Sequence, residues 1–267
     1  MRSFLFAPGH DAKLLERVFI AGADAVMLDL EDAVPEHAKE RAREMVADAL
    51  RRRPAWVRVN APRTERCARD LEAVAAAALG VRVPKVESAQ EVAWVAARAP
   101  GVSLCCTIET ARGVLAAAEI AAAPQVAQLV FGAVDLRADL RSEPGELPTL
   151  YARSHLVLAS RAAGIAAPCD SAFTRIEDDA GLRREAEFAR SLGFFGKSAI
   201  HPRQLATIHA VFTPDAAQVT WARRVLAAFE AAGGAATRSA GGEMVDIPVA
   251  LRARQILAVS EEGEPER

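Results

Sequence analysis

The chain has 267 residues, a length that suits either two small domains or a single α/β barrel. Hydrophobic residues make up 51% and charged residues 25% of it, which is typical of a folded globular protein and excludes a mainly disordered chain. The formal net charge is −2, and no basic stripe offers contacts to a phosphate backbone, so we expect no nucleic-acid partner.

Membrane attachment and disulfide bonding are not expected either. No run reaches the roughly 20 continuous apolar residues that cross a bilayer, and the apolar run near the N-terminus is too short for a signal peptide. The four cysteines, two of them adjacent, show neither a disulfide framework nor a zinc spacing. We therefore expect a cytoplasmic protein with reduced thiols.

Eight short apolar runs alternate with longer helical stretches along most of the chain. The runs lie at 3–9, 24–32, 55–61, 81–86, 103–110, 128–136, 166–173 and 193–202. The helical stretches lie at 11–21, 38–52, 65–79, 88–98, 112–122, 150–163 and 177–191. This alternation is typical of βα units around a parallel sheet, and eight units predict a closed (β/α)8 TIM barrel. An open doubly wound sheet would carry a Gly-rich phosphate turn after its first strand, and "APGHD" is not one.

The chain continues beyond the eighth run with further helical patterns near 203–210, 215–232 and 248–259. The Gly, Ala and Ser content of 233–242 indicates a loop, and the last seven residues, "EEGEPER", are expected to fray. We predict two domains, a barrel catalytic domain at 1–212 and a C-terminal helical extension with a lid segment at 213–267.

Polar residues follow most of the apolar runs, where the strands of a barrel would end. The loops that follow the strands of such a barrel gather on one face, and catalytic residues lie there. The residues are Asp29, Glu31, Asp32, Arg58, Asn60, Lys85, Glu87, Glu109, Asp135, Asp170, Lys197 and His201.

Glu109 and Asp135 follow neighbouring predicted strands, so their carboxylates could converge on one cation. Oxygen ligands suit a hard cation, and Mg²⁺ with waters or substrate in its remaining positions fits such a pair best. A single carboxylate at a strand end is more often a helix cap or a surface ion pair. Two on adjacent strand ends favour the metal site.

Arg58 lies between Val57 and Val59 in a run that should be buried, where a charge needs a partner. It could form an ion pair with the acidic cluster at 29–32, or face an oxygen that becomes negative during a reaction. Both can hold at once. Lys85 is interpreted as an ion-paired lysine rather than a Schiff-base nucleophile, because nearby carboxylates would raise its pKa. His201, which precedes a proline, is interpreted as a packing residue.

Several of these motifs together resemble the citrate lyase β-subunit-like branch of the HpcH/HpaI aldolase family, over essentially the whole chain. The motifs are "RSFLFAPG", "GADAVMLDLEDAV", "VRVN", "VPKVES", "IETARGV", "FGAVDLRADL", "AAGIAAPCD" and "LGFFGKSAIHPRQ", in this order. The resemblance implies a TIM barrel that binds Mg²⁺ and makes or breaks a carbon–carbon bond between a CoA thioester and a 2-oxo acid.

The resemblance also implies roles for particular residues. The metal ligands would be Glu109 and Asp135, and Arg58 would face the oxygens of the oxo acid and the thioester. The backbone at 132–134 would hold the carboxylate of the oxo acid. These substrate-binding residues are Gly132, Ala133 and Val134. Around them, Glu31 and Asp32 would hold the waters of the metal and orient Arg58.

A further match, "GGEMVDIPVALRARQIL", resembles a C-terminal segment that relatives place over the active site of a neighbouring subunit. Asp246 would then be the acid/base toward the acyl group. It could equally cap the helix that follows it, two residues ahead of Pro248. If Asp246 does reach a neighbour, the contact is heterologous and closes into a ring, such as a homotrimer or a multiple of it.

The expected function is therefore Mg²⁺-dependent cleavage or formation of a 3-hydroxy-carboxyacyl-CoA thioester of the citryl, malyl or citramalyl type. Two alternatives stay open. One is a pyruvate-type aldolase that acts without CoA, and the other is an accessory β subunit of a citrate lyase complex that acts on an acyl-carrier protein. No motif identifies the acyl group, because such substrates differ by only a few atoms.

Overall fold

The computed structural model describes residues 1–262, and the chain divides into two compact units, Met1–Ile208 and His209–Arg267. The division falls inside α10 (Leu205–Phe212), so a helix runs across it. The domain boundary predicted after residue 212 coincides with the end of this helix, and it stays a proposal.

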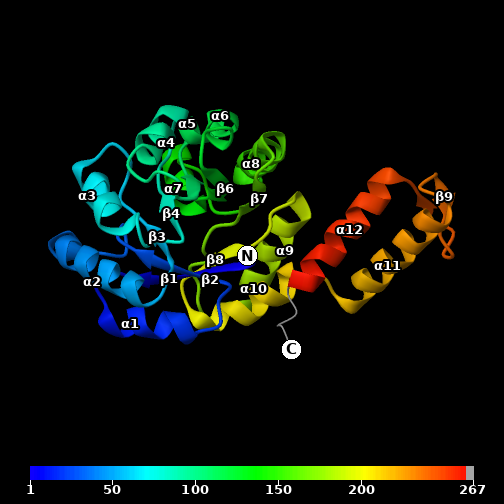
Figure 1. Cartoon of the computed structure of the whole chain (residues 1–267), viewed down its shortest axis with the longest axis horizontal. Helices are drawn as coiled ribbons and strands as arrows, with labels where there is room; N and C mark the ends of the chain where they lie inside the picture. Colours follow the sequence, from blue (N-terminus) through cyan, green and yellow to red (C-terminus); the bar gives the residue numbers. More distant parts are fainter. Residues whose placement is uncertain (263–267) are drawn as a thin grey trace. The chain divides into compact units, whose positions relative to one another are not determined.

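The first unit is a barrel of eight parallel strands, as the eight apolar runs predicted (Figure 1). The strands are β1 (Ser3–Pro8), β2 (Ala25–Asp29), β3 (Trp56–Arg58), β4 (Gly80–Val83), β5 (Leu104–Ile108), β6 (Val126–Phe131), β7 (Ala166–Cys169) and β8 (Lys197–Ala199). Their spatial order is β7-β6-β5-β4-β3-β2-β1-β8, and a parallel bridge between Asp170 and Lys197 joins its two ends. The predicted (β/α)8 TIM barrel is confirmed.

Helices follow the strands and surround them (Figure 1). Their first turns are commonly capped by Ser, Thr or Asp; Thr64, for example, accepts a hydrogen bond from the N–H of Cys67. The helices of this unit are α1 (Ala12–Arg17), α2 (Lys39–Arg52), α3 (Glu65–Val74), α4 (Ala89–Ala96), α5 (Ala111–Leu115), α6 (Ala117–Ala121), α7 (Ala133–Leu140), α8 (Leu150–Ala163) and α9 (Asp179–Leu192). Short 3-10 helices are η1 (Val18–Ile20), η2 (Glu36–Ala38), η3 (Leu147–Thr149) and η4 (Pro202–Gln204).

The sixth apolar run, predicted as one strand at 128–136, is a strand followed by a helix. Strand β6 ends at Phe131, Gly132 is the N-cap residue, and α7 begins at Ala133. Ala133 and Leu136 are both buried, which is the spacing of a helix face and not the alternation of a strand. Asp135 therefore lies in the first turn of a helix and not at the end of a strand.

The barrel interior is apolar at one end and carries ion pairs where the sheet closes. Its apolar cluster is made of Phe4, Ala25, Met27, Trp56, Cys105, Val130 and Cys169. At the closure, the carboxylate of Asp170 binds Lys197 at 2.6 Å and Arg153 at 2.5 Å, and all three side chains are buried. Burial alone would raise the pKa of Asp170, but these two cations hold it below its usual value.

The second unit is a helical hairpin. Helices α11 (Ala216–Ala231) and α12 (Ile247–Glu262) pack side by side, and an antiparallel pair of short strands, β9 (Thr237–Arg238) and β10 (Met244–Val245), connects them (Figure 1). The segment predicted as a plain loop thus contains a strand. The predicted frayed tail falls mostly at 263–267, outside the described residues.

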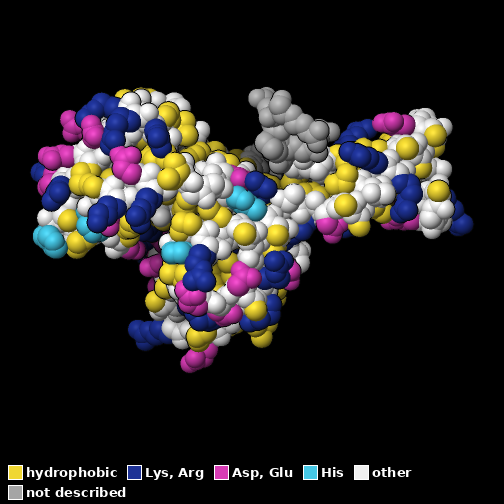
Figure 2. Space-filling view, turned by 90° about the horizontal axis from the view of Figure 1, so that it is seen from below, with side chains coloured by type: hydrophobic (Ala, Val, Ile, Leu, Met, Phe, Trp, Pro, Cys, Tyr) yellow, Lys and Arg dark blue, Asp and Glu magenta, His cyan; other side chains and the backbone are white. Residues whose placement is uncertain are grey.

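Charged side chains of both signs are interspersed over the face drawn in Figure 2, as the small net charge would suggest. Within residues 1–262, no helix combines the length and apolar character that a membrane span requires.

Candidate active site

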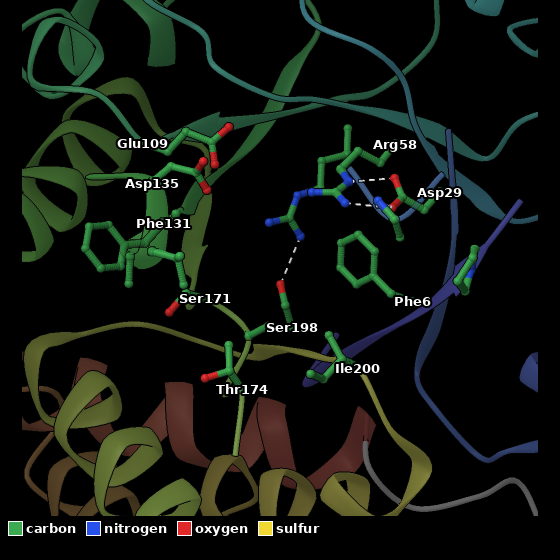
Figure 3. Close-up of a pocket in the computed structure, with 17 residues that line it drawn as sticks. Phe6, Asp29, Arg58, Glu109, Phe131, Asp135, Ser171, Thr174, Ser198 and Ile200 are labelled. Carbon is green, nitrogen blue, oxygen red and sulfur yellow. Dashed lines mark hydrogen bonds and ion pairs between the residues drawn. The ribbon is translucent and has the colours of Figure 1, made fainter. Parts of the chain in front are cut away.

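A cavity of about 230 Å³ lies at the carboxyl ends of the barrel strands. Residues that line it come from the whole barrel sequence, from Phe6 to Ile200. The carboxyl ends of the strands are also where barrels of this kind place their active sites. Its polar lining groups, several of them labelled in Figure 3, are Asp29, Arg58, Arg82, Glu109, Asp135, Ser171, Thr174 and Ser198. Phe6, Phe131 and Ile200 supply apolar walls.

Glu109 and Asp135 lie on one wall of the cavity (Figure 3). Glu109 follows β5 and is buried, and its Oε1 accepts a hydrogen bond of 2.7 Å from the backbone N–H of Lys85. Burial raises the pKa of Glu109 to about 7, and the negative charges of Glu31 and Asp135 add to this rise. The wall therefore concentrates negative charge in a place poor in water.

Gly132 allows these two carboxylates to approach each other. A Cβ atom at this position would lie 2.4 Å from both Cβ and Oε2 of Glu109, closer than any side chain tolerates. The missing side chain leaves the Glu109 carboxylate room directly beside the first turn of α7, which carries Asp135.

This pair of carboxylates fits a hard divalent cation. Both ligands are oxygens, and their mutual repulsion, visible in the raised pKa of Glu109, would be relieved by a positive ion. Among the described residues, no group of three or more His, Cys, Asp or Glu side chains could enclose a metal. The arrangement therefore suits an ion that keeps open positions for substrate and water.

Arg58 lies across the cavity from this wall and is held by Asp29 (Figure 3). Its Nε and Nη2 donate to the two carboxylate oxygens of Asp29 at 2.7 and 2.6 Å. Burial alone would lower the pKa of Arg58 and raise that of Asp29, but the ion pair reverses both shifts. Arg58 is thus a charged guanidinium of fixed orientation that faces the cavity.

Glu31 connects Arg58 to Lys85. Its Oε2 lies 2.9 Å from Nη1 of Arg58, and its Oε1 accepts a hydrogen bond of 2.7 Å from Nζ of Lys85. Asp32 is mostly exposed and lies 3.4 Å from Lys85, and within the described residues it makes no ion pair or hydrogen bond with Arg58. Of the two acidic residues expected to orient Arg58, only Glu31 contacts it, and the two-point partner is Asp29.

The three residues expected to bind an oxo-acid carboxylate, Gly132, Ala133 and Val134, all line the cavity. They open α7, whose first helical hydrogen bond runs from the N–H of Leu136 to the carbonyl of Gly132 at 3.1 Å. The N–H groups that precede Leu136 have no partner within the helix, and the helix dipole adds partial positive charge there. This end of α7 can accept an anion.

Other residues singled out in the sequence lie elsewhere. His201 accepts a hydrogen bond from the N–H of Arg203 at 3.2 Å and is the N-cap residue of η4. In the second unit, Oδ1 of Asp246 accepts from the N–H of Val249 at 3.2 Å, so it caps α12 as one of its two interpretations predicted.

Sequence reasoning missed Arg82, which lies in β4 and lines the cavity. Its Nε donates to the hydroxyl of Thr107 at 3.0 Å and its Nη1 to that of Ser198 at 2.9 Å, the bond drawn as the dashed line that ends at Ser198 in Figure 3. Burial lowers the pKa of Arg82, and the nearby charge of Arg58 acts in the same direction. The signal was present, because Arg82 is a charge inside an apolar run, as Arg58 is.

The sequence and the fold are similar to those of known proteins. Residues 2–202 match the family model for HpcH/HpaI aldolase/citrate lyase, and residues 153–261 match a model for a C–C bond lyase of the TIM-barrel fold. The citrate lyase subunit beta-like protein of Deinococcus radiodurans is 40% identical, over 97% of this chain and 96% of that protein. The (3S)-malyl-CoA thioesterase of Cereibacter sphaeroides is 39% identical, over 97% of this chain and 94% of that protein.

Among solved structures, CitE from Mycobacterium tuberculosis in complex with magnesium, acetoacetate and coenzyme A is 37% identical. It superposes with a TM-score of 0.84 and covers 97% of this chain and 98% of its own. The chain belongs to the HpcH/HpaI aldolase/citrate lyase family.

Proposed function

We propose that this protein is a Mg²⁺-dependent carbon–carbon lyase that cleaves, or in reverse forms, a 3-hydroxy-carboxyacyl-CoA thioester, with an acyl-CoA and a 2-oxo acid as products. The observation that carries the proposal is the opposition, across one cavity, of the Glu109–Asp135 wall and the fixed guanidinium of Arg58. Magnesium and coenzyme A accompany the related CitE structure, which supports the same cofactor and thioester here.

Glu109 and Asp135 would hold the Mg²⁺ ion. The bound ion would polarise the substrate's hydroxyl and carboxylate oxygens and lower the pKa of the hydroxyl. The N–H groups in the first turn of α7 that have no partner within the helix would donate hydrogen bonds to the substrate's carboxylate, next to Asp135. Glu31 contacts both Arg58 and Lys85, and would hold these two side chains in place.

Arg58 would stabilise the charge that forms during cleavage. As the hydroxyl loses its proton to a base, the electrons of the carbon–carbon bond pass to the thioester fragment and generate an enolate oxygen. A guanidinium held at two points by Asp29 can donate to that oxygen without reorganising. The enolate carbon then takes up a proton and leaves as the acyl-CoA.

We further propose that Asp246 supplies this proton, in the cavity of a neighbouring subunit. The support is the resemblance of residues 241–257 to the C-terminal segment of the family. In its own chain Asp246 caps α12, and a capping carboxylate keeps its second oxygen for other contacts. The assembly would then be a homo-oligomer with a closed ring, such as a trimer.

Hydrolysis is a second candidate activity, which the relative named (3S)-malyl-CoA thioesterase favours. A lyase releases a 2-oxo acid and an acyl-CoA, whereas a thioesterase releases free CoA thiol and the hydroxy acid. The products therefore separate the two activities, and a pyruvate-type aldolase would cleave free hydroxy-oxo acids with no thioester present.

The test is a cleavage assay with citryl-, citramalyl- and malyl-CoA, with and without Mg²⁺, that records 2-oxo acid and CoA thiol separately. Wild type should release 2-oxo acid only with Mg²⁺, and Glu109→Gln and Asp135→Asn should each abolish this. Glu119→Gln, an exposed acidic residue of α6, is the matched control and should behave as wild type. Full activity in Glu109→Gln would refute the proposed metal site, and cleavage of free hydroxy-oxo acids alone would refute the thioester substrate.

A further inference from the structure

Arg82 is a buried guanidinium that lines the cavity and has no carboxylate partner among residues 1–262. The residue is 5% exposed and lines the cavity, and its polar contacts are the hydroxyls of Thr107 and Ser198. No ion pair among the described residues includes Arg82. Hydroxyl groups accept its hydrogen bonds but do not neutralise its charge.

The groups around Arg82 do not supply the missing negative charge. Both oxygens of Asp29 are engaged by Arg58. The thiols of Cys105 and Cys169 are neutral at pH 7, because burial raises their pKa values to about 12 and about 11. The charge of Glu109 acts on Arg82 without an ion pair, and the proposed function assigns that carboxylate to the metal.

A second positive charge lies close by. The guanidinium carbons of Arg58 and Arg82 lie 5.0 and 5.1 Å from the centre of the same Phe6 ring. The ring attracts both cations weakly, but two buried like charges repel each other. Arg58 is compensated by Asp29 and Glu31, and Arg82 is not. A buried charge without compensation is costly, and an anion that enters the cavity would remove this cost.

We propose that Arg82 binds a second carboxylate of the substrate, on the 2-oxo acid part, so that the protein selects thioesters that release a 2-oxo dicarboxylic acid. This inference rests on the proposed function. The first carboxylate of the oxo acid is assigned to the metal wall and the start of α7. The hydroxyls of Ser198 and Ser171, which also line the cavity, can donate to the second carboxylate beside Arg82.

The three thioesters differ at the group that Arg82 would contact. Citryl-CoA carries a carboxymethyl group there, citramalyl-CoA a methyl group and malyl-CoA a hydrogen atom. A guanidinium left without an anion disfavours the last two, because their binding would bury the cation against a methyl group or an empty space. Wild type should therefore cleave citryl-CoA with the highest kcat/KM, and should bind oxaloacetate more tightly than pyruvate.

The variants are Arg82→Met, which removes the charge at similar volume, and Arg82→Lys, which keeps the charge and loses the planar fork. Arg51→Met, on the exposed face of α2, is the matched control. Arg82→Met should lower the affinity for oxaloacetate relative to pyruvate by about 10- to 100-fold, the range of a charge-assisted hydrogen bond. Arg82→Lys should fall between it and wild type.

Thermal unfolding separates binding from a purely structural role. If Arg82 is a binding residue whose charge is uncompensated in the free protein, unliganded Arg82→Met should unfold at the same temperature as unliganded wild type or at a higher one. The reason is that the substitution removes a costly buried charge. Oxaloacetate should then stabilise wild type more than Arg82→Met. A structural arginine would show the opposite, with a lower unfolding temperature in Arg82→Met and no change in ligand preference.

Three results would overturn the inference. They are a wild type that cleaves citramalyl- or malyl-CoA better than citryl-CoA, an unchanged ratio of oxaloacetate to pyruvate affinity in Arg82→Met, and, where Arg82→Met does not fold, a wild type that binds oxaloacetate no more tightly than pyruvate. If wild type cleaves no thioester, the proposed function fails, and the two affinities still decide the role of Arg82.

Discussion

Asp29 and Arg58 form a two-point ion pair between neighbouring strands, with Asp29 fully buried and Arg58 facing the cavity. The two residues are also direct partners in the register of β2 and β3. The orientation of the guanidinium is thus set by a carboxylate that cannot itself reach water. Under the proposed function, Asp29 would act on the reaction through Arg58, as a positioning residue.

Asp29→Asn should lower kcat more than it raises KM. The amide offers only one acceptor oxygen to the guanidinium and carries no charge, so Arg58 loses its fixed orientation while the cavity keeps its shape. A misplaced catalytic group costs roughly 100-fold in rate, and we expect a fall in kcat of about that size. Asp48→Asn, whose carboxylate pairs with Arg51 on the surface, is the control and should not change kcat. A wild-type kcat in Asp29→Asn would contradict the positioning role.

Gly132→Ala should weaken Mg²⁺ binding. The new methyl group would lie 2.4 Å from the Glu109 carboxylate, so the Glu109 side chain must leave its present position on the cavity wall. Calorimetric titration of the variant with Mg²⁺ should show an affinity at least about tenfold lower, the scale of lost ligand positioning in metal sites. The control is Gly241→Ala, where an added Cβ meets nothing closer than 3.7 Å. Equal affinities in the two variants would exclude the close approach as a requirement of the site.

The barrel was predictable because each of its strands is a short apolar run bounded by polar residues, a pattern that local sequence displays directly. The run that contains Asp135 was not resolved correctly, since "FGAVDL" is apolar enough for a strand and only burial of Ala133 and Leu136 on one face identifies it as helix. The pair of strands β9 and β10 in the second unit was not predicted, for a related reason. Its strands have two residues each, too few for a period to appear.

Some residues of the site could likewise be predicted from the sequence and others could not. Glu109, Arg58 and Gly132 were predicted because they end apolar runs or match family motifs, and the structure brings all three to one cavity. The partner of Arg58 was not resolved among the acidic residues at 29–32, because strand register and not sequence distance decides which carboxylate faces it. Arg82 was overlooked although it is a charge inside an apolar run, because its partners are the uncharged hydroxyls of Thr107 and Ser198 and not a carboxylate that the sequence could suggest.

Acid should destabilise the protein partly through Asp170. Its pKa in the folded state is below its usual value near 3.8, so its contribution to the free energy of unfolding is complete above about pH 5 and is lost as the pH falls through the folded pKa. Between pH 5 and pH 3 the urea midpoint of wild type should therefore fall, and this group should lower the free energy of unfolding by up to about 1.4 kcal/mol per pH unit.

Asp170→Asn provides the comparison. It should be less stable at pH 7, by about 3 kcal/mol, because Lys197 and Arg153 lose their buried partner. Its midpoint should then decline less steeply below pH 5 than that of wild type. The exposed carboxylate of Glu177, paired with Arg203 on the surface, gives the control Glu177→Gln, which should follow wild type throughout. Parallel curves for wild type and Asp170→Asn would rule out Asp170 as a source of the acid sensitivity.

Asp246 has two assigned roles that a pair of substitutions separates. Its carboxylate caps α12 through the N–H of Val249, and the proposed function also makes it the proton donor to the enolate carbon. Serine is as good a cap as aspartate but cannot act as an acid, whereas alanine can do neither. Asp246→Ser should therefore unfold at the wild-type urea concentration and lose about 100-fold or more in kcat, the contribution of a positioned general acid. Asp246→Ala should lose the same activity and, in addition, about 1 kcal/mol of stability in the second unit. If Asp246→Ser keeps its activity, capping is the whole role of Asp246, and the proton must come from a residue of the barrel or from water.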